Sequence, residues 1–147
     1  MKELNIEKNL LYYVRLVKRL YEKLLTEVAA ECDLALAEAD GLLFLKEYPD
    51  YNSARDVALL REVSPAYVSK AVETLVQRGY VTTSQDKKDR RIQHLYITEL
   101  AQPTADMLHE AQMKFFEMIV DGLTADEFAE LVQIVGKCII NIQLAVE

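Results

Sequence analysis

A short polar segment in the middle of the chain carries the residue types best suited to recognising a partner. Ser64 and Pro65 are typical of a helix start, because serine can accept a hydrogen bond from a free amide of the first turn and proline has no amide to satisfy there. Val68, Val72 and Leu75 recur at i, i+4 and i+7, which predicts one buried helix face. The other positions would face outward and could contact a partner. They are Ser64, Pro65, Ala66, Tyr67, Ser69, Lys70, Glu73 and Thr74.

A charged turn follows this helix. Gly79 is a typical helix stop, since glycine readily adopts the positive φ of a C-terminal cap. Residues 81–85 and 92–97 predict two strands, with a charged tip between them. We expect the Asp89 carboxylate to hold Arg91, or the arginine before it, outward through a charge-assisted hydrogen bond. The candidate binding residues of the tip are Lys87, Lys88, Asp89, Arg90 and Arg91.

The charge distribution points to the same region. The chain of 147 residues has a formal net charge of −7, which by itself disfavours binding to phosphate. Residues 53–98, however, contain eight basic and five acidic residues, a net charge of +3, whereas the rest of the chain carries nine and nineteen, a net charge of −10. Because the Debye length is about 8 Å at physiological salt, the distant acidic part does not cancel the local positive charge. The sequence therefore favours contact of this region with nucleic acid.

These motifs together resemble the MarR family of bacterial transcription regulators. The resemblance implies a winged helix-turn-helix that binds double-stranded DNA as a homodimer. Two positions depart from the family pattern: Thr74 stands where many members carry a basic residue, and Ala37 where many carry threonine. The matching residues are Ser64-Pro65-Ala66-Tyr67-Val68-Ser69-Lys70, then Leu75, Arg78-Gly79-Tyr80-Val81, the tip residues Asp86, Asp89, Arg90 and Arg91, and Ile97-Thr98, where the family usually has Leu-Thr.

The rest of the chain predicts helices on both sides of this region. The expected fold is mainly α with a small β-hairpin wing, in one protomer of residues 1–147. Residues 37–98 would form the winged helix-turn-helix, and residues 4–32 and 99–146 the long dimerisation helices. The expected helices are residues 4–32, 37–47, 54–60, 65–78, 98–120 and 125–146, with a turn at residues 48–52.

The terminal helices carry more apolar surface than a winged core requires. An exposed apolar surface of that size usually marks an interface, and the resemblance implies that these helices interlock in a two-fold dimer. No continuous apolar run approaches the ~20 residues of a membrane span. The first five residues have no apolar core of a signal peptide. We therefore expect a cytoplasmic protein without membrane contact.

The histidines and cysteines of the sequence give little support to an enzymatic or a redox function. His94 and His109 lie on different predicted elements, and no nucleophile, base and orienting residue can be placed together. Cys32 and Cys138 are too few and too far apart for a disulfide framework. Both are expected to be buried thiols, because Cys138 lies on an apolar helix and neither has a flanking cluster of basic residues.

The resemblance also includes zinc-sensing regulators. Cys32, Asp40 and His109 fall near the regions that bind metal in those relatives. Gly41 and Met113, however, stand where further histidines would be expected, and zinc needs about four ligands. We therefore predict no metal and no cofactor.

The sequence thus predicts a sequence-specific transcriptional regulator, a ligand-responsive repressor that binds an inverted repeat, and not an enzyme. The alternatives are a winged module that binds protein and not DNA, or a metal- or redox-sensing member of the same family. Five basic residues between Lys8 and Lys23 are interpreted as a solvated face, with contact to the DNA backbone as the alternative. Aromatic residues of the first two helices could line a pocket for a small-molecule effector. They are Tyr12, Tyr13, Tyr21 and Phe44.

Overall fold

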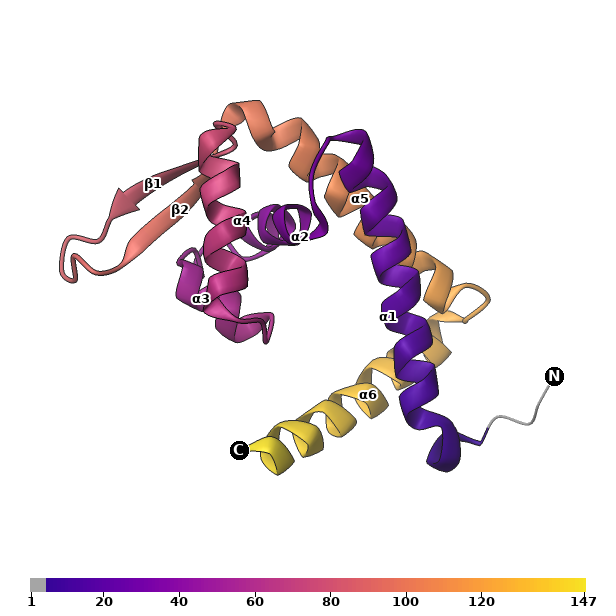
Figure 1. Ribbon diagram of the computed structural model, residues 1–147. Coiled ribbons are helices and arrows are strands. Elements are labelled where there is room, and N and C mark those ends of the chain that lie inside the picture. The colour runs from indigo at the N-terminus through magenta and orange to yellow at the C-terminus, as the bar shows by residue number, and fades with distance from the viewer. Residues whose placement is uncertain (1–4) are drawn as a thin grey trace. The chain divides into compact units, whose positions relative to one another are not determined.

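Helices dominate the structure, a computed structural model that describes residues 5–147 (Figure 1). The chain forms two compact units, Met1–Phe115 and Phe116–Glu147. The fold class predicted from the sequence is confirmed: it is mainly α with one antiparallel β-hairpin. The elements are α1 (Ile6–Glu31), α2 (Leu36–Glu47), α3 (Ala54–Leu60), α4 (Pro65–Gln77), β1 (Val81–Gln85), β2 (Gln93–Ile97), a 3₁₀ turn (Glu99–Ala101), α5 (Gln102–Val120) and α6 (Ala125–Val146).

Helix α2 is the centre of the first unit. It is apolar around most of its circumference, and its residues Leu42, Leu43 and Phe44 are fully buried. A helix of this composition is stable only when other elements surround it. Figure 1 shows α2 between α1 and α4, both of which it contacts. Since α2 touches α4 directly, the core of this unit also fixes the position of α4.

Polar capping residues fix the starts of α3 and α4. Ser53 Oγ accepts the Asp56 amide at 3.1 Å, and the Asp56 carboxylate accepts the Ser53 amide at 3.0 Å. This reciprocal pair is a capping box, which satisfies two backbone donors at the start of α3. At the start of α4, Ser64 Oγ accepts the Tyr67 amide at 3.2 Å, and Pro65 takes the first helical position. Both helix starts therefore lie where the sequence predicts them.

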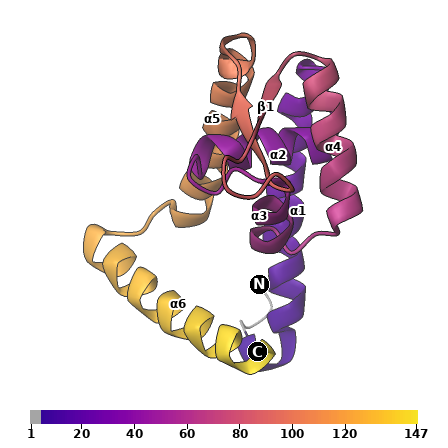
Figure 2. The same cartoon turned by 90° about the vertical axis from the view of Figure 1, so that its left-hand side faces the viewer.

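The two strands pair in the register Val81↔Ile97 to Gln85↔Gln93. Gly79 has φ +70°, a left-handed conformation that ends α4 and turns the chain into β1. The second strand begins at Gln93, one residue later than predicted, because the Ile92 amide donates to the Asp89 carbonyl within the tip. Figure 2 shows the hairpin toward the viewer with α4 beside it.

The helix predicted to start at residue 98 begins as a 3₁₀ turn and becomes α-helical at Gln102. The reason is Pro103, which has no amide to donate to the Glu99 carbonyl four residues earlier. The Gln102 amide donates to that carbonyl instead, which gives the tighter spacing of a 3₁₀ turn.

Helix α6 makes up most of the second unit, and none of its residues is buried. Thr124 and Glu127 form the predicted capping box at its start. Cys138 is exposed and Cys32 only half-buried, so the prediction of two buried thiols is wrong for this chain alone. Helix α6 is long and apolar enough to span a bilayer by length and composition, with a mean hydropathy of 1.4, although Glu130 and Lys137 interrupt its apolar sequence.

Candidate nucleic-acid interface

Helix α4 turns one polar face to solvent. Val68, Ala71 and Leu75 are buried on its other side and hold the helix against the core. Val72, predicted to be buried, is only half-buried, and Ala71 takes its place in the core. The predicted contact residues that lie exposed on α4 and its cap are Ser64, Pro65, Ala66, Tyr67, Ser69, Lys70 and Glu73.

Two hydroxyls predicted to contact a partner already bond within the helix. Ser64 Oγ caps the first turn. Thr74 is half-buried, and its Oγ1 donates to the Lys70 carbonyl at 3.2 Å. Neither hydroxyl is therefore free to use all of its hydrogen bonds on a partner. Ser69, Lys70 and Glu73 remain as the exposed polar side chains of the middle turns.

Tyr67 projects from the first turn of α4 and keeps a neutral hydroxyl. Its pKa is raised because partial burial disfavours the phenolate and because the carboxylates of Asp40 and Glu22 repel it. A neutral phenol can both donate and accept a hydrogen bond. Tyr67 therefore suits contact with phosphate as well as with a base edge.

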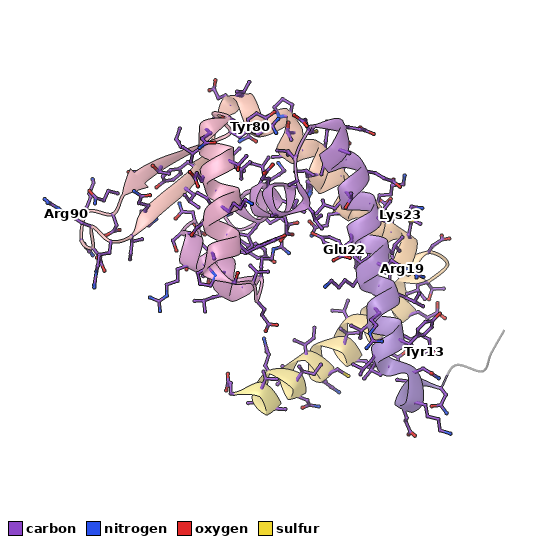
Figure 3. The ribbon with its side chains drawn as sticks, in the orientation of Figure 1. Tyr13, Arg19, Glu22, Lys23, Tyr80 and Arg90 are labelled. Atoms are coloured by element: carbon purple, nitrogen blue, oxygen red, sulfur yellow. The ribbon has the colours of Figure 1, made fainter. Side chains whose placement is uncertain are left out.

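The hairpin tip is a hydrogen-bonded turn. Asp86 Oδ1 accepts the amides of Lys88 and Asp89, each at 2.7 Å. The pKa of Asp86 is lowered to about 2, first by a hydrogen bond from His94 and then by these two amides. The tip is therefore held in one conformation by an ionised side chain, and Arg90 extends from its end away from the helices (Figure 3).

The hydrogen bond expected between Asp89 and Arg91 is present. Arg91 Nε and Nη2 donate to the two carboxylate oxygens of Asp89, each at 3.1 Å, and the Arg91 amide donates to the same carboxylate at 3.0 Å. These bonds lower the pKa of Asp89. The Arg91 side chain is nevertheless 90% exposed, so one edge of its guanidinium is held while the rest faces solvent.

A groove of about 1190 Å³ lies between α3, α4 and the hairpin. Polar residues from three elements meet there, and two of them, Arg55 on α3 and His94 on β2, were not predicted to belong to a binding surface. The excess of cations in residues 53–98 was the only sequence signal that included Arg55. The predicted residues that line the groove are Ser69, Glu73, Asp89, Arg90 and Arg91, whereas Lys70, Lys87 and Lys88 are exposed outside its lining.

Comparison with known proteins identifies this arrangement. A profile of the MarR family matches residues 33–92, which include α2, α3, α4 and the hairpin tip. The chain is also 32% identical over 110 residues to the transcriptional regulator AdcR of Streptococcus pneumoniae, an alignment that covers 73% of this chain and 74% of AdcR. The chain belongs to the MarR family. It is a MarR-family transcriptional regulator.

Solved structures of MarR proteins share the fold. A MarR protein from Peptoclostridium difficile superimposes with a TM-score of 0.80 at 23% identity, covering 99% of this chain and 93% of that chain. A MarR family transcriptional regulator from Listeria monocytogenes in complex with a 26mer DNA superimposes with a TM-score of 0.79 at 17% identity, covering 97% and 90%. At these identities the likeness shows the fold alone.

The four aromatic residues considered as an effector pocket have different surroundings in this MarR chain. Tyr12 is 57% exposed and packs edge-on against Tyr13. Phe44 is fully buried under the Arg61 guanidinium. Tyr21 donates to Asp40 at 3.2 Å, and its pKa is raised to about 12 by burial and by that carboxylate. Phe44 and Tyr21 therefore belong to the packed interior, whereas Tyr12 lies on the surface.

Two of the residues weighed as metal ligands lie near charged side chains. Asp40 Oδ1 lies 3.6 Å from Arg61 Nη2, and His109 Nδ1 lies 3.7 Å from Glu47 Oε1. Within residues 5–147, no three His, Cys, Asp or Glu side chains are placed so that they could hold a metal ion.

Proposed function

We propose that this MarR-family regulator binds double-stranded DNA as a homodimer, reads an inverted repeat and represses transcription. The observation that carries the proposal is the shared groove, where the polar face of α4 and the Asp89-held Arg91 line the same concave surface. A helix and a hairpin arranged in this way can contact two neighbouring grooves of one duplex.

The α4 helix fits the major groove. That groove is about 12 Å wide and admits an α-helix. Ser69 and Lys70 occupy the middle of the exposed face, where a helix lying in the groove comes nearest to the bases. Glu73 would accept a hydrogen bond from a cytosine amino group, so it contributes to sequence choice without adding positive charge.

The hairpin fits the minor groove beside it. A narrow, A·T-rich minor groove has an enhanced negative potential that attracts arginine. The guanidinium of Arg91 is always charged and planar, and Asp89 holds one edge of it while the remainder is exposed. Lys87 and Lys88 lie on the outside of the same tip and would contact phosphates.

The dimer would form through the terminal helices. Apolar residues repeat along one stripe of α6, among them Val132, Val135, Ile139 and Ile142, which are 42–61% exposed. Gln133, Glu130 and Lys137 lie on the opposite side, next to the exposed apolar residues Ile140 and Leu144. The charged residues on that side suit a protein interface better than a lipid environment. Apolar residues of α1 are exposed in the same way, including Leu10, Val14 and Val17.

Sedimentation velocity tests the dimer. Ile139→Asp places a charge on the apolar stripe and should convert the protein to a monomer that no longer binds an inverted repeat. Gln133→Asp introduces the same charge on the opposite side of α6 and should leave the dimer intact. If Ile139→Asp remains a dimer at micromolar concentration, the stripe is not the interface.

A small-molecule effector belongs to the proposal as the source of regulation. Two DNA-binding units on a two-fold axis should contact half-sites about 34–36 Å apart. A ligand that binds one separation of these units better than another would shift the DNA affinity. The proposed location of such a regulator is the cytoplasm, where it has access to DNA.

DNA selection followed by sequencing is the direct test of the proposed function. The purified protein should enrich fragments that contain one inverted repeat. Its affinity for random duplex should fall steeply with salt, because each phosphate contact releases counterions. Lack of enrichment together with a flat salt dependence would favour the alternative, a winged module that binds another protein.

A further inference from the structure

His94 lies where the hairpin joins the helices. Its backbone bridges to Ser53, and the amide of Leu95 donates to the Asn52 carbonyl at 2.7 Å. Asn52 is buried, and the side chain of His94 is 31% exposed. The imidazole ring therefore stands on backbone that the core of the unit holds in place.

Each ring nitrogen of His94 has a polar partner. Nδ1 lies 2.7 Å from Asn52 Oδ1, and Nε2 lies 3.0 Å from Asp86 Oδ2. An imidazolium donates to both partners, and a neutral ring is satisfied when the Asn52 amide turns to donate. In either form the ring connects the residue before the α3 cap with the first residue of the hairpin tip.

The hydrogen bonds continue from Asp86 to the guanidinium. While one Asp86 oxygen meets His94, the other accepts the amides of Lys88 and Asp89. The Asp89 side chain then holds Arg91 through two bonds. An unbroken series of hydrogen bonds thus runs from buried Asn52 to an arginine that is almost fully exposed.

We propose that His94 is a positioning residue for DNA binding, which fixes the tip turn by bridging Asn52 and Asp86 so that Asp89 presents Arg91. This inference rests on the proposed contact between hairpin and DNA, and it requires no contact of His94 with DNA. A two-stranded hairpin is only marginally stable by itself. Without the bridge the tip would sample several conformations, and DNA binding would have to pay the entropy of ordering it.

A double-mutant cycle on DNA affinity tests this role. His94→Ala, Arg91→Ala and the double variant are titrated with a duplex that the wild-type protein selects. His94→Ala should weaken binding about fivefold to tenfold in the wild-type background. It should weaken binding less than about twofold once Arg91 is alanine, because residues of one network are not additive. Thr82→Ala, on the exposed part of β1, is the matched control and should bind like wild type.

A second variant separates positioning from folding. Asp86→Ala removes the next residue of the series at the tip and should reproduce the loss seen with His94→Ala. If His94→Ala does not fold, His94→Gln and Asp86→Ala carry the same cycle with Arg91→Ala. Equal losses with and without Arg91 would overturn the inference, as would wild-type affinity in His94→Ala. A wild-type protein that binds no duplex would instead overturn the proposed function.

Discussion

Arg91 and Asp89 form a two-point contact in which Nε and Nη2 of the guanidinium each lie 3.1 Å from a different carboxylate oxygen. The carboxylate stands on a surface proposed to approach phosphates, which repel it. Its presence is explained if it restricts Arg91 to an outward conformation, since a preorganised side chain loses less entropy on binding. If Asp89 has this role, variants of Arg91 and Asp89 should lower the DNA affinity in a definite order.

The first prediction is that order. Arg91→Ala should lose about tenfold or more in DNA affinity and reduce the slope of log affinity against log salt by about one. Arg91→Lys should recover only part of the loss, because lysine restores the charge without the planar fork. Asp89→Ala should also weaken binding, although it removes a negative charge next to DNA. Fluorescence anisotropy over a range of salt concentrations measures all three variants.

The sign of the Asp89→Ala effect decides between two explanations. Tighter binding than wild type, in a variant with an unchanged melting temperature, would mean that charge repulsion dominates and that the orienting role is wrong. Asp50→Ala is the control for removing a carboxylate charge alone, because Asp50 lines the same groove without a hydrogen bond to an arginine in the described structure.

The second prediction concerns the effect of low pH on the hairpin tip. The pKa of Asp86 is about 2, below its ordinary 3.8, because His94 and two amides bond to the ionised carboxylate. A lowered native pKa means that this carboxylate stabilises the tip fully above pH 3.8 and that the effect is lost as the pH falls toward 2. In NMR spectra the amides of Lys88 and Asp89 should titrate with a midpoint near 2.

Two variants check this assignment. In Asp86→Asn the titration of these amides should disappear. In His94→Ala the midpoint should rise toward 3.8, because the largest cause of the shift is gone. Protected amides of α2 report whether the unit is still folded. A wild-type midpoint at or above 3.8 would contradict the contacts described for Asp86.

Local patterns predicted the helices and the hairpin well. The i, i+4, i+7 spacing of Val68, Val72 and Leu75 identified α4, and Ser64 marked its N-cap. The bond between Asp89 and Arg91 was also predictable, since the two residues are only two positions apart on one turn. In each case the deciding interaction joins residues a few positions apart, so the sequence contains it directly.

Contacts between distant segments could not be predicted in this way. The bridge from Asn52 to His94 joins residues 42 positions apart, and no periodicity signals it. Cys138 was predicted to be buried because its helix is apolar, yet apolarity does not distinguish a core within one chain from a face left exposed. The exposure of the aromatic residues proposed for an effector pocket was unpredictable for a similar reason, since helical spacing does not show that Tyr12 lies on the surface and Phe44 in the core.

The third prediction concerns backbone strain at the end of α4. Gly79 has φ +70°, so Gly79→Ala should lower the free energy of unfolding by about 1–2 kcal/mol. Gly41→Ala makes the same chemical change within α2, where the added Cβ would lie 3.9 Å from Leu75 Cδ1, an ordinary contact. It should be neutral or stabilising by up to about 1 kcal/mol. Urea denaturation compares the two, and equal effects would show that φ at Gly79 is not the cause.

The fourth prediction compares the basic residues of the winged region with those of α1. Lys70 lies on the exposed face of α4, whereas Lys23 lies on α1 (Figure 3). Lys70→Ala should weaken DNA binding by about 1–3 kcal/mol if the ammonium reads a base. The loss should then be larger on the selected duplex than on random duplex. If Lys70 contacts only phosphate, both duplexes should lose affinity about equally, and the salt slope should fall by about one.

Lys23→Ala removes the same charge from α1 and is the matched control. It should bind both duplexes like wild type if the basic residues of α1 are a solvated face, because charges beyond a Debye length of about 8 Å are largely screened. A loss in Lys23→Ala equal to that in Lys70→Ala would assign α1 to the DNA backbone as well. Wild-type binding by Lys70→Ala on both duplexes would mean that α4 does not enter the groove.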